Sequence, residues 1–309
     1  MPGLTIRNLH HSIVLWLNIF IVINLSEAQP LTHPDTLNPA RLRTVIIAES
    51  AFYVAGLSYL QFVWYRNHER VPFHWYNDNA GWLQLDKAGH AYAAYFESAI
   101  GYHALRWAGV SRHKALWYGG LLGLVLQTPI EVFDGLYEGY GFSWGDMGAN
   151  AAGSALFMVQ EAWLGRQAVR MKFSYAPSPY AQYRPWVLGE SPGQRFFQDY
   201  NGHTYWLSLN LHSVAPSWGL PPWLNVAVGY SGNGMLSEFT NPAFSRGIRM
   251  PDLVRHRQYF LSVDLDLTQI PVRNAYLRGL FRVLNIIKIP APALEFNRVD
   301  GLRLRAVYF

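Results

Sequence analysis

The first half of the chain alternates long apolar segments with short polar ones. Apolar segments cover about residues 41–64, 86–109, 113–135 and 146–166, and each is long enough for a helix. Acidic or amide residues interrupt every one of them, beginning with Glu49 in the first. The pattern predicts a bundle of about four helices with an inward polar seam, either in a membrane or as a very apolar soluble bundle.

A different pattern begins near residue 201. TYWLSLNLHSV and YFLSVDLDLTQI alternate apolar and polar side chains, and LNVAVGYSGNGM and the terminal LRLRAVYF repeat the alternation, as strands with one wet face do. Residues 272–287 instead place apolar residues at helical spacing. Outer-membrane barrels share such strands, but about four convincing strands are fewer than the eight or so that a single-chain barrel needs. We therefore expect an α+β fold, an apolar helical bundle followed by a small antiparallel β region, with outer-membrane association left open.

The N-terminal segment MPGLTIRNLHHSIVLWLNIFIVINLSEAQP resembles a secretory signal peptide. One arginine precedes an apolar run, and small residues stand at the cleavage positions before Gln29. An uncleaved anchor helix is the alternative. The expected organisation is a signal peptide over 1–28, a helical domain over 41–170, an irregular linker rich in Pro, Tyr and Gln over 171–200, and a β-rich C-terminal region over 201–309.

Composition favours the cell envelope over the cytoplasm. Aromatic residues make up 16% of the chain and charged residues only 15%, against roughly 25% charged in ordinary soluble domains. The net charge of +5 is spread along the chain, which excludes nucleic acid as an expected partner. The absence of cysteine excludes disulfides, a cysteine-ligated metal and a lipid-modified cysteine. We expect an exported, membrane-associated protein of the periplasm or outer membrane, whose partners are the membrane or other envelope components.

Three of the expected helices carry a polar stripe on an apolar body. At 3.6 residues per turn, one face of each helix collects the residues of one stripe. The stripes are Asp86, His90 and Glu97; Gln127, Glu131 and Asp134; and Asp146 and Asn150. Lys87 lies about 100° round from Asp86, so it either pairs with a neighbouring acid or points to solvent. Ser143 is the expected N-cap of the last helix.

Such stripes are costly against lipid or a hydrophobic core unless they face one another. We therefore predict a shared polar pocket between three helices, with Asp146 and Asn150 facing His90 and Glu131. The small residues of the last helix should allow the close helix contact that this arrangement needs; they are Gly148, Ala149, Ala152 and Gly153.

The motifs DKAGH, QTPIEVFDG and GFSWGDMGANAAGS occur in this order between about residues 75 and 165. Together they resemble the YfiM-like family of predicted periplasmic lipoproteins of unknown function and, more distantly, VanZ-like membrane proteins. The chain departs from the lipoprotein pattern because it lacks cysteine and adds about 140 residues of mostly β-type sequence. Neither resemblance implies a reaction or a cofactor.

Three classes of function remain open, and the first is favoured. It is an envelope protein whose pocket binds a ligand or partner, with the aromatic loop from Phe73 to Trp82 at the entrance. The second is a membrane-associated metal-dependent or acid/base hydrolase, although HExxH, GxSxG and Walker motifs are missing. The third is a structural protein whose polar seam only fixes helix packing. No catalytic residue, metal ligand or cofactor is assigned.

Overall fold

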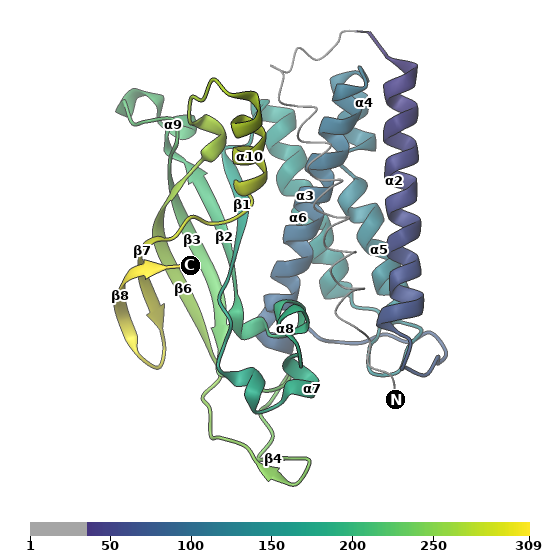
Figure 1. Cartoon of the computed structure of the whole chain (residues 1–309), viewed down its shortest axis with the longest axis vertical. Helices are drawn as coiled ribbons and strands as arrows, with labels where there is room; N and C mark the ends of the chain where they lie inside the picture. Colours follow the sequence, from purple (N-terminus) through teal and green to yellow (C-terminus); the bar gives the residue numbers. More distant parts are fainter. Residues whose placement is uncertain (1–35) are drawn as a thin grey trace. The chain divides into compact units, whose positions relative to one another are not determined.

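The computed structural model describes residues 36–309, which form two compact units that meet in sequence at Ala168 and Val169 (Figure 1). We call residues 36–168 the helical unit and residues 169–309 the sheet unit. The expected signal peptide lies outside the described residues. The division into helices followed by a sheet confirms the expected α+β fold class.

The helical unit consists of long helices joined by short turns and one aromatic loop. Its helices are α2 (Pro39–Tyr59), which continues into a π-helical turn (Leu60–Trp64), then α3 (Leu85–Trp107), α4 (Arg112–Tyr118), α5 (Leu122–Asp134) and α6 (Trp144–Leu164). The prediction of a single third helix over about residues 113–135 is therefore wrong, because the structure divides this segment into α4 and α5. A Cβ atom on Gly119 would lie 2.4 Å from the backbone of Gly101 in α3, so the chain between the two helices passes directly against α3.

Helix α6 begins and packs largely as its sequence predicts. The side chain of Ser143 accepts a hydrogen bond from the backbone N–H of Asp146 at 3.1 Å, which confirms the expected N-cap. A Cβ atom on Gly153 would lie 2.1 Å from the carbonyl oxygen of Ala91, so this glycine allows α3 and α6 to touch through their backbones. Gly148, which was expected at the same contact, is exposed and has open space around it.

Two stretches of the described chain are long and apolar enough to cross a membrane, Pro39–Trp64 and Arg112–Asp134. The second contains the break between α4 and α5. The 13 residues of α5 reach only about 20 Å, less than the roughly 30 Å of a hydrocarbon core. Only 6% of the apolar window in the first stretch is buried, whereas core helices are mostly buried. By these criteria, α2 with its π-helical turn is the better candidate for lipid contact in the helical unit.

The sheet unit is built on one antiparallel sheet in the order β1-β2-β3-β6-β7-β8. Its strands are β1 (Val169–Tyr175), β2 (His203–Asn210), β3 (Leu224–Asn233), β6 (His256–Leu265), β7 (Ala291–Asn297) and β8 (Gly301–Tyr308), with a separate pair β4 (Phe244–Ser245) and β5 (Ile248–Arg249). The helices are α7 (Pro185–Leu188), α8 (Pro192–Gln198), α9 (Leu211–Val214) and α10 (Ala275–Leu284). Helix α10 lies within residues 272–287, where a helix was expected.

The sheet is larger than expected, with six strands where about four were predicted. Strand β1 occupies the start of the segment that was expected to be an irregular linker, and β7 was not predicted. The hydroxyl of Tyr308 in β8 lies 3.0 Å from that of Thr204 in β2, although three strands stand between them. In a flat sheet that separation would be about 19 Å. The sheet is therefore strongly curved, and we call its concave side the inner face and its convex side the outer face.

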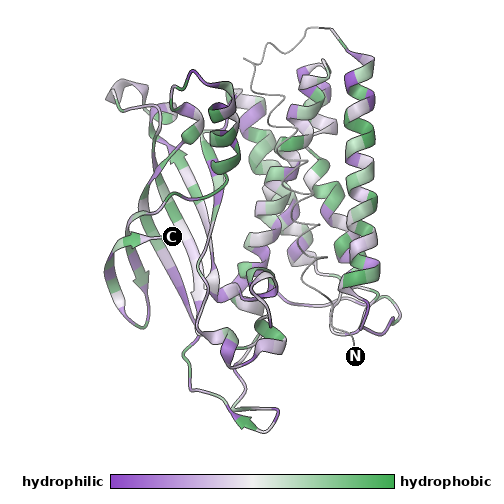
Figure 2. Ribbon diagram, in the orientation of Figure 1, coloured by the Kyte–Doolittle hydropathy of each residue, from purple (hydrophilic) through white to green (hydrophobic). Residues whose placement is uncertain are grey.

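The two faces differ sharply in polarity, and Figure 2 shows the alternation of apolar and polar residues along the strands. The inner face holds a small aromatic cluster centred on Trp206 and Phe260, with many buried polar side chains around it. The outer face carries exposed apolar side chains such as Val228, Leu261 and Leu304. This distribution is the reverse of that in a soluble protein with one dry core.

Candidate functional site

The centre of the helical unit holds a lysine surrounded by carboxylates. Lys87 Nζ lies 2.6 Å from Asp78 Oδ2, 2.9 Å from Asp146 Oδ1 and 3.4 Å from Asp86 Oδ2. Its side chain is 13% exposed, so these contacts are partly shielded from water. The sequence left open whether Lys87 pairs with an acid, and in the structure it pairs with three.

His90 lies one turn further along α3 and connects the lysine cluster to α5 and α6. Its Nδ1 is 3.1 Å from Asn150 Oδ1, and its Nε2 is 3.6 Å from Glu131 Oε1 and 3.9 Å from Asp146 Oδ1. Because Asn150 Oδ1 is an acceptor, the proton of a neutral imidazole belongs on Nδ1, and Nε2 is the nitrogen that faces the acids. We call the seven residues in these contacts the polar centre; they are Asp78, Asp86, Lys87, His90, Glu131, Asp146 and Asn150.

Three buried atoms of the polar centre have no hydrogen-bond partner among the described residues. One is Asp146 Oδ1, which lies 2.9 Å from Lys87 Nζ in an ion pair. The other two are Glu131 Oε1 and Asn150 Nδ2, on side chains that are 1% and 0% exposed. The other carboxylate oxygen of Glu131 accepts from the backbone N–H of Ser143 at 3.2 Å, which fixes the orientation of the group. An unsatisfied buried polar atom costs roughly 1–3 kcal/mol, so Glu131 Oε1 and Asn150 Nδ2 both favour a further group at this place.

The chain enters α3 through an unusual backbone conformation. Trp82, Leu83 and Gln84 have φ angles of 44°, 54° and 66°, in the left-handed region that side chains other than glycine rarely adopt. Each such residue costs roughly 1–2 kcal/mol. Strain of this kind concentrates at functional sites, and here it immediately precedes Asp86 and Lys87 in the first turn of α3.

Burial raises the pKa of three acids in or beside the polar centre. Burial raises the pKa of Glu131 to about 8, that of Asp134 to about 7, and that of Asp146 to about 6, and neighbouring carboxylates contribute in each case. At Asp78 burial acts in the same direction, but hydrogen bonds and the ammonium of Lys87 lower its pKa below the ordinary value. Burial alone would lower the pKa of His90, but Asp86, Asp146 and Glu131 together raise it above its ordinary value. The polar centre therefore holds an excess of negative charge, which it relieves by retaining protons.

Three predicted site residues lie outside the polar centre. Gln127 donates to Glu97 Oε1 at 2.8 Å, so these two stripe residues pair with each other. Burial raises the pKa of Glu97 to about 8. Asp134 accepts a hydrogen bond from the hydroxyl of Tyr65. The predicted stripes do face one another, but as a row of separate contacts along the helices instead of one shared pocket.

Sequence reasoning missed Asp78, which lies between the first two expected helices. Its Oδ2 makes the shortest of the three contacts to Lys87, and its Oδ1 accepts from the hydroxyl of Ser143 at 2.6 Å. Tyr65 was also missed. No periodic pattern could reveal either residue, because Asp78 lies in the loop before α3 and Tyr65 directly after the π-helical turn.

The aromatic loop packs beside the start of α6. Trp75 stacks on Trp144 with ring centroids 5.4 Å apart, and Phe142 contacts both rings. Trp75 and Trp144 are exposed although they are large and apolar. Because the same loop carries Asp78, the exposed aromatic surface and the polar centre belong to one continuous segment of chain.

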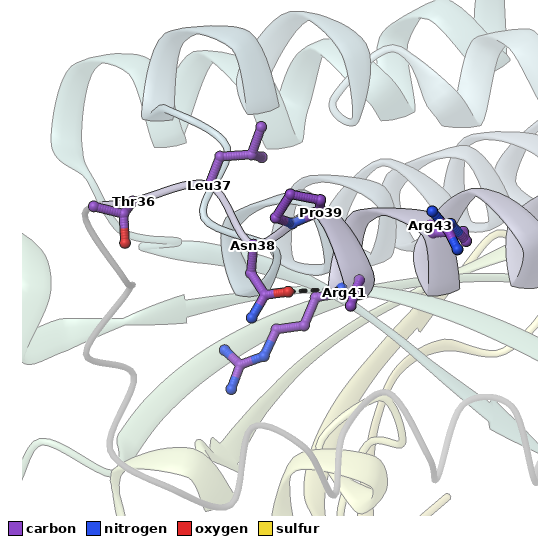
Figure 3. A pocket seen from close by; sticks show the side chains of 7 residues that line it. Thr36, Leu37, Asn38, Pro39, Arg41 and Arg43 are labelled. Carbon is purple, nitrogen blue, oxygen red and sulfur yellow. Dashed lines mark hydrogen bonds between the residues drawn. The ribbon is translucent and has the colours of Figure 1, made fainter.

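A pocket appears elsewhere, at the beginning of α2 (Figure 3). It is lined only by the stretch from Thr36 to Arg43, in which Asn38 accepts a hydrogen bond from the backbone of Arg41. All of its walls come from the first residues that the structure describes, and the polar centre contributes none of them. We therefore assign it no function.

The polar centre contains a set of side chains that suits a metal ion. Ligand atoms of Asp86, His90 and Asp146 all lie within 4.8 Å of one another. Carboxylate oxygen and imidazole nitrogen are common ligands for divalent transition metals. Asn150 would orient the imidazole from behind, as hydrogen-bond partners of metal-ligating histidines do.

Comparison with known proteins finds one similarity, which lies within the helical unit. Residues 74–162 match the model of a family described as predicted periplasmic lipoprotein (DUF2279). The resemblance seen in the three motifs is thus confirmed at this level. The match extends from the aromatic loop almost to the end of α6 and includes the whole polar centre, but no part of the sheet unit. No curated protein and no solved structure matches the chain.

The family description supports an exported, periplasmic, membrane-anchored location. The sequence contains no cysteine to carry a lipid, which departs from that description. The finer resemblances to YfiM-like and VanZ-like proteins, the signal peptide and the outer membrane stay predictions.

Proposed function

We propose that the chain is an envelope protein whose helical unit binds a divalent cation at the polar centre, and through it an anionic group of an envelope ligand. The observation that carries the proposal is the convergence of Asp86, His90 and Asp146 beside Glu131 Oε1, a buried oxygen that accepts no hydrogen bond from the described residues. This goes beyond the sequence analysis, which assigned no metal ligand.

The charge balance supports a cation. Four carboxylates of the polar centre face one lysine and one histidine. With the acids ionised and His90 neutral, the excess of negative charge is greater than one divalent ion removes. A divalent cation would compensate most of this charge and would replace the proton that His90 otherwise keeps.

The donor set also supports an additional ligand on the cation. Three or four protein ligands leave coordination positions open for water or for an anionic oxygen. Lys87 and the free amide N–H of Asn150 lie beside the same centre and can both donate to such an oxygen. A lipid headgroup phosphate or a glycan carboxylate has this chemistry.

Isothermal titration of the metal-free full chain with Mn²⁺ and with Zn²⁺ tests the proposal. We expect one cation per chain, with proton release on binding near pH 7. Asp146→Asn should weaken binding at least tenfold, because it removes the charge of one ligand while conserving its shape. His113→Ala, at an exposed histidine of α4, is the matched control and should bind normally.

The structural alternative predicts a different result. If the polar centre only fixes helix packing, the wild-type chain binds neither cation, and Asp146→Asn changes stability alone. In that case we would abandon ligand binding and treat the centre as a packing device.

A further inference from the structure

A row of aromatic side chains crosses the outer face of the sheet at one register position. The antiparallel pairings align one aromatic residue from each of five neighbouring strands, and these are Phe173, Tyr205, Tyr230, Tyr259 and Phe296. Tyr259 and Phe296 are about half exposed, whereas Tyr205 is buried and Phe173 packs against Phe196 of α8, so the exposed end of the row lies on β6 and β7. The five strands are distant in sequence, but each contributes an aromatic residue to the same row across the sheet.

The rows on one side of this aromatic row are aliphatic and uncharged. The next row on the same face contains Met171, Leu207, Val228, Leu261, Leu294 and Leu304. Four of these, Leu207, Val228, Leu261 and Leu294, are between 41% and 52% exposed. The row beyond continues with Val226 and Val263, again without a charge. A contiguous surface of this kind is rare on a soluble monomer and indicates a contact.

The inner face of the same strands carries the charges. Lys172 Nζ lies 2.8 Å from Asp264 Oδ2, and both side chains are completely buried. Glu295 Oε2 accepts from Arg305 at 2.6 Å on the same side. Each strand therefore points polar residues inward and apolar residues outward, which is the arrangement of strands in an outer membrane and the opposite of a soluble sheet.

The dimensions of the apolar surface suit lipid. Along β3 the outer face runs from Leu224 to Tyr230, seven residues or about 20 Å. With the roughly 40° tilt of membrane strands this length covers about 16 Å, about one leaflet of a roughly 30 Å core. The aromatic row marks one end of this length. Tyrosine favours such an interfacial position.

Cationic groups lie beyond both ends. Arg257 follows the aromatic row on the outer face, opposite Gly232. At the other end, Asn285 directly after α10 donates to Asp266 at 3.1 Å, which places α10 beside the end of β6. Helix α10 exposes Tyr276 and Leu280 and carries Arg278 and Arg282, the composition of a helix that lies in a membrane interface. Arg257, beyond the aromatic row, can pair with the phosphates of the headgroup layer at that interface.

We propose that the outer face of the sheet lies against the hydrocarbon of a lipid bilayer, with the aromatic row at the bilayer interface. A second copy of the chain could also cover an apolar surface, but a protein partner would not require aromatic residues and arginines graded by depth. The inference is independent of cation binding by the helical unit.

Single-cysteine labelling tests the proposal directly, because the natural sequence contains no cysteine. Leu261→Cys places an environment-sensitive fluorophore in the middle of the apolar surface. Val299→Cys places it in the turn between β7 and β8, beyond the aromatic row, at a residue that is similarly exposed. Both full-length variants are reconstituted into vesicles of phosphatidylethanolamine and phosphatidylglycerol, after circular dichroism has shown that they are folded.

We expect lipid with a spin label in the middle of its acyl chain to quench the Leu261 label at least threefold more strongly than the Val299 label. Aqueous iodide should show the reverse order. Equal iodide quenching at the two positions would overturn the proposal. Efficient cross-linking of two Leu261→Cys chains without quenching by lipid would also overturn it and would identify the face as a dimer interface.

Discussion

Replacing Lys87 by methionine tests how strongly the carboxylates of the polar centre depend on one ammonium group. The substitution keeps the length of the side chain and removes its charge, so that Asp78, Asp86 and Asp146 lose the cation that lies within 3.4 Å of each. Removing one partner of a buried ion pair costs roughly 3–5 kcal/mol. Because the side chains of Lys87 and Asp86 are 13% and 26% exposed, we expect the lower end, about 3 kcal/mol at pH 8.

The cost should depend on pH in a definite direction. The pKa of Asp146 is already about 6, and loss of the neighbouring ammonium raises it further. Below pH 5 Asp146 takes up a proton, so the penalty should become smaller. A divalent cation should reduce it as well, since a ligand at one hundred times its dissociation constant stabilises the folded state by about 2.7 kcal/mol.

Urea unfolding followed by circular dichroism at 222 nm measures the free energy of unfolding of the helices. Lys114→Met is the matched control, because Lys114 is exposed on α4 and its replacement should change stability by less than about 0.5 kcal/mol. If Lys87→Met is as stable as this control at pH 8, the ammonium does not hold the centre together and the electrostatic reasoning is refuted.

Two other perturbations have predicted signs. Gly153→Ala should destabilise the helical unit by at least about 2 kcal/mol in thermal or urea unfolding, because the added Cβ would lie 2.1 Å from a carbonyl oxygen. Gly148→Ala, at a position with open space, should stabilise the unit by up to about 1 kcal/mol. Similar effects of the two substitutions would show that the backbone contact at Gly153 is absent. Burial raises the pKa of Glu97 and of Glu131 to about 8, so the folded state holds protons that the unfolded state has already released. The metal-free chain should therefore lose stability as pH rises from 6 to 8.5, by about 1.4 kcal/mol per pH unit for each such proton. A flat profile of unfolding free energy against pH would contradict this.

Periodicity predicted most of the helical unit, because burial on one side imposes a spacing that the sequence displays. Asp86, His90, Asp146 and Asn150 converge as their spacing requires, and Gly153 makes the predicted close contact. The break between α4 and α5 was not predicted. It depends on a glycine that touches another helix, and such a tertiary contact has no signature in the local pattern.

The polar centre was predicted only where its residues lie on helices. Asp78 approaches Lys87 from a loop, where spacing carries no information about direction. The expected pocket was an inference from the cost of isolated polar stripes. That cost is met in part by pairwise contacts, such as that between Gln127 and Glu97, so the same physical argument permits a row of contacts as well as one pocket.

The sheet shows a further limit of sequence patterns. Alternation predicts that a strand has two different faces, but it does not tell which face is buried. In β2 the polar residues Ser208 and Asn210 are buried and Leu207 is exposed, so the expected assignment of the wet face is reversed. Strand β7 begins with the sequence Ala-Pro-Ala and is short, and proline lowers the strand signal.

The most direct test of the central claim is an anomalous diffraction map of the crystallised chain after soaking with Mn²⁺ or Zn²⁺. The account predicts a peak about 2.0–2.2 Å from a carboxylate oxygen of Asp86, from His90 Nε2 and from a carboxylate oxygen of Asp146, and its absence in Asp146→Asn. A wild-type map with no peak at these three residues, in crystals that take up the metal at other positions, would contradict it.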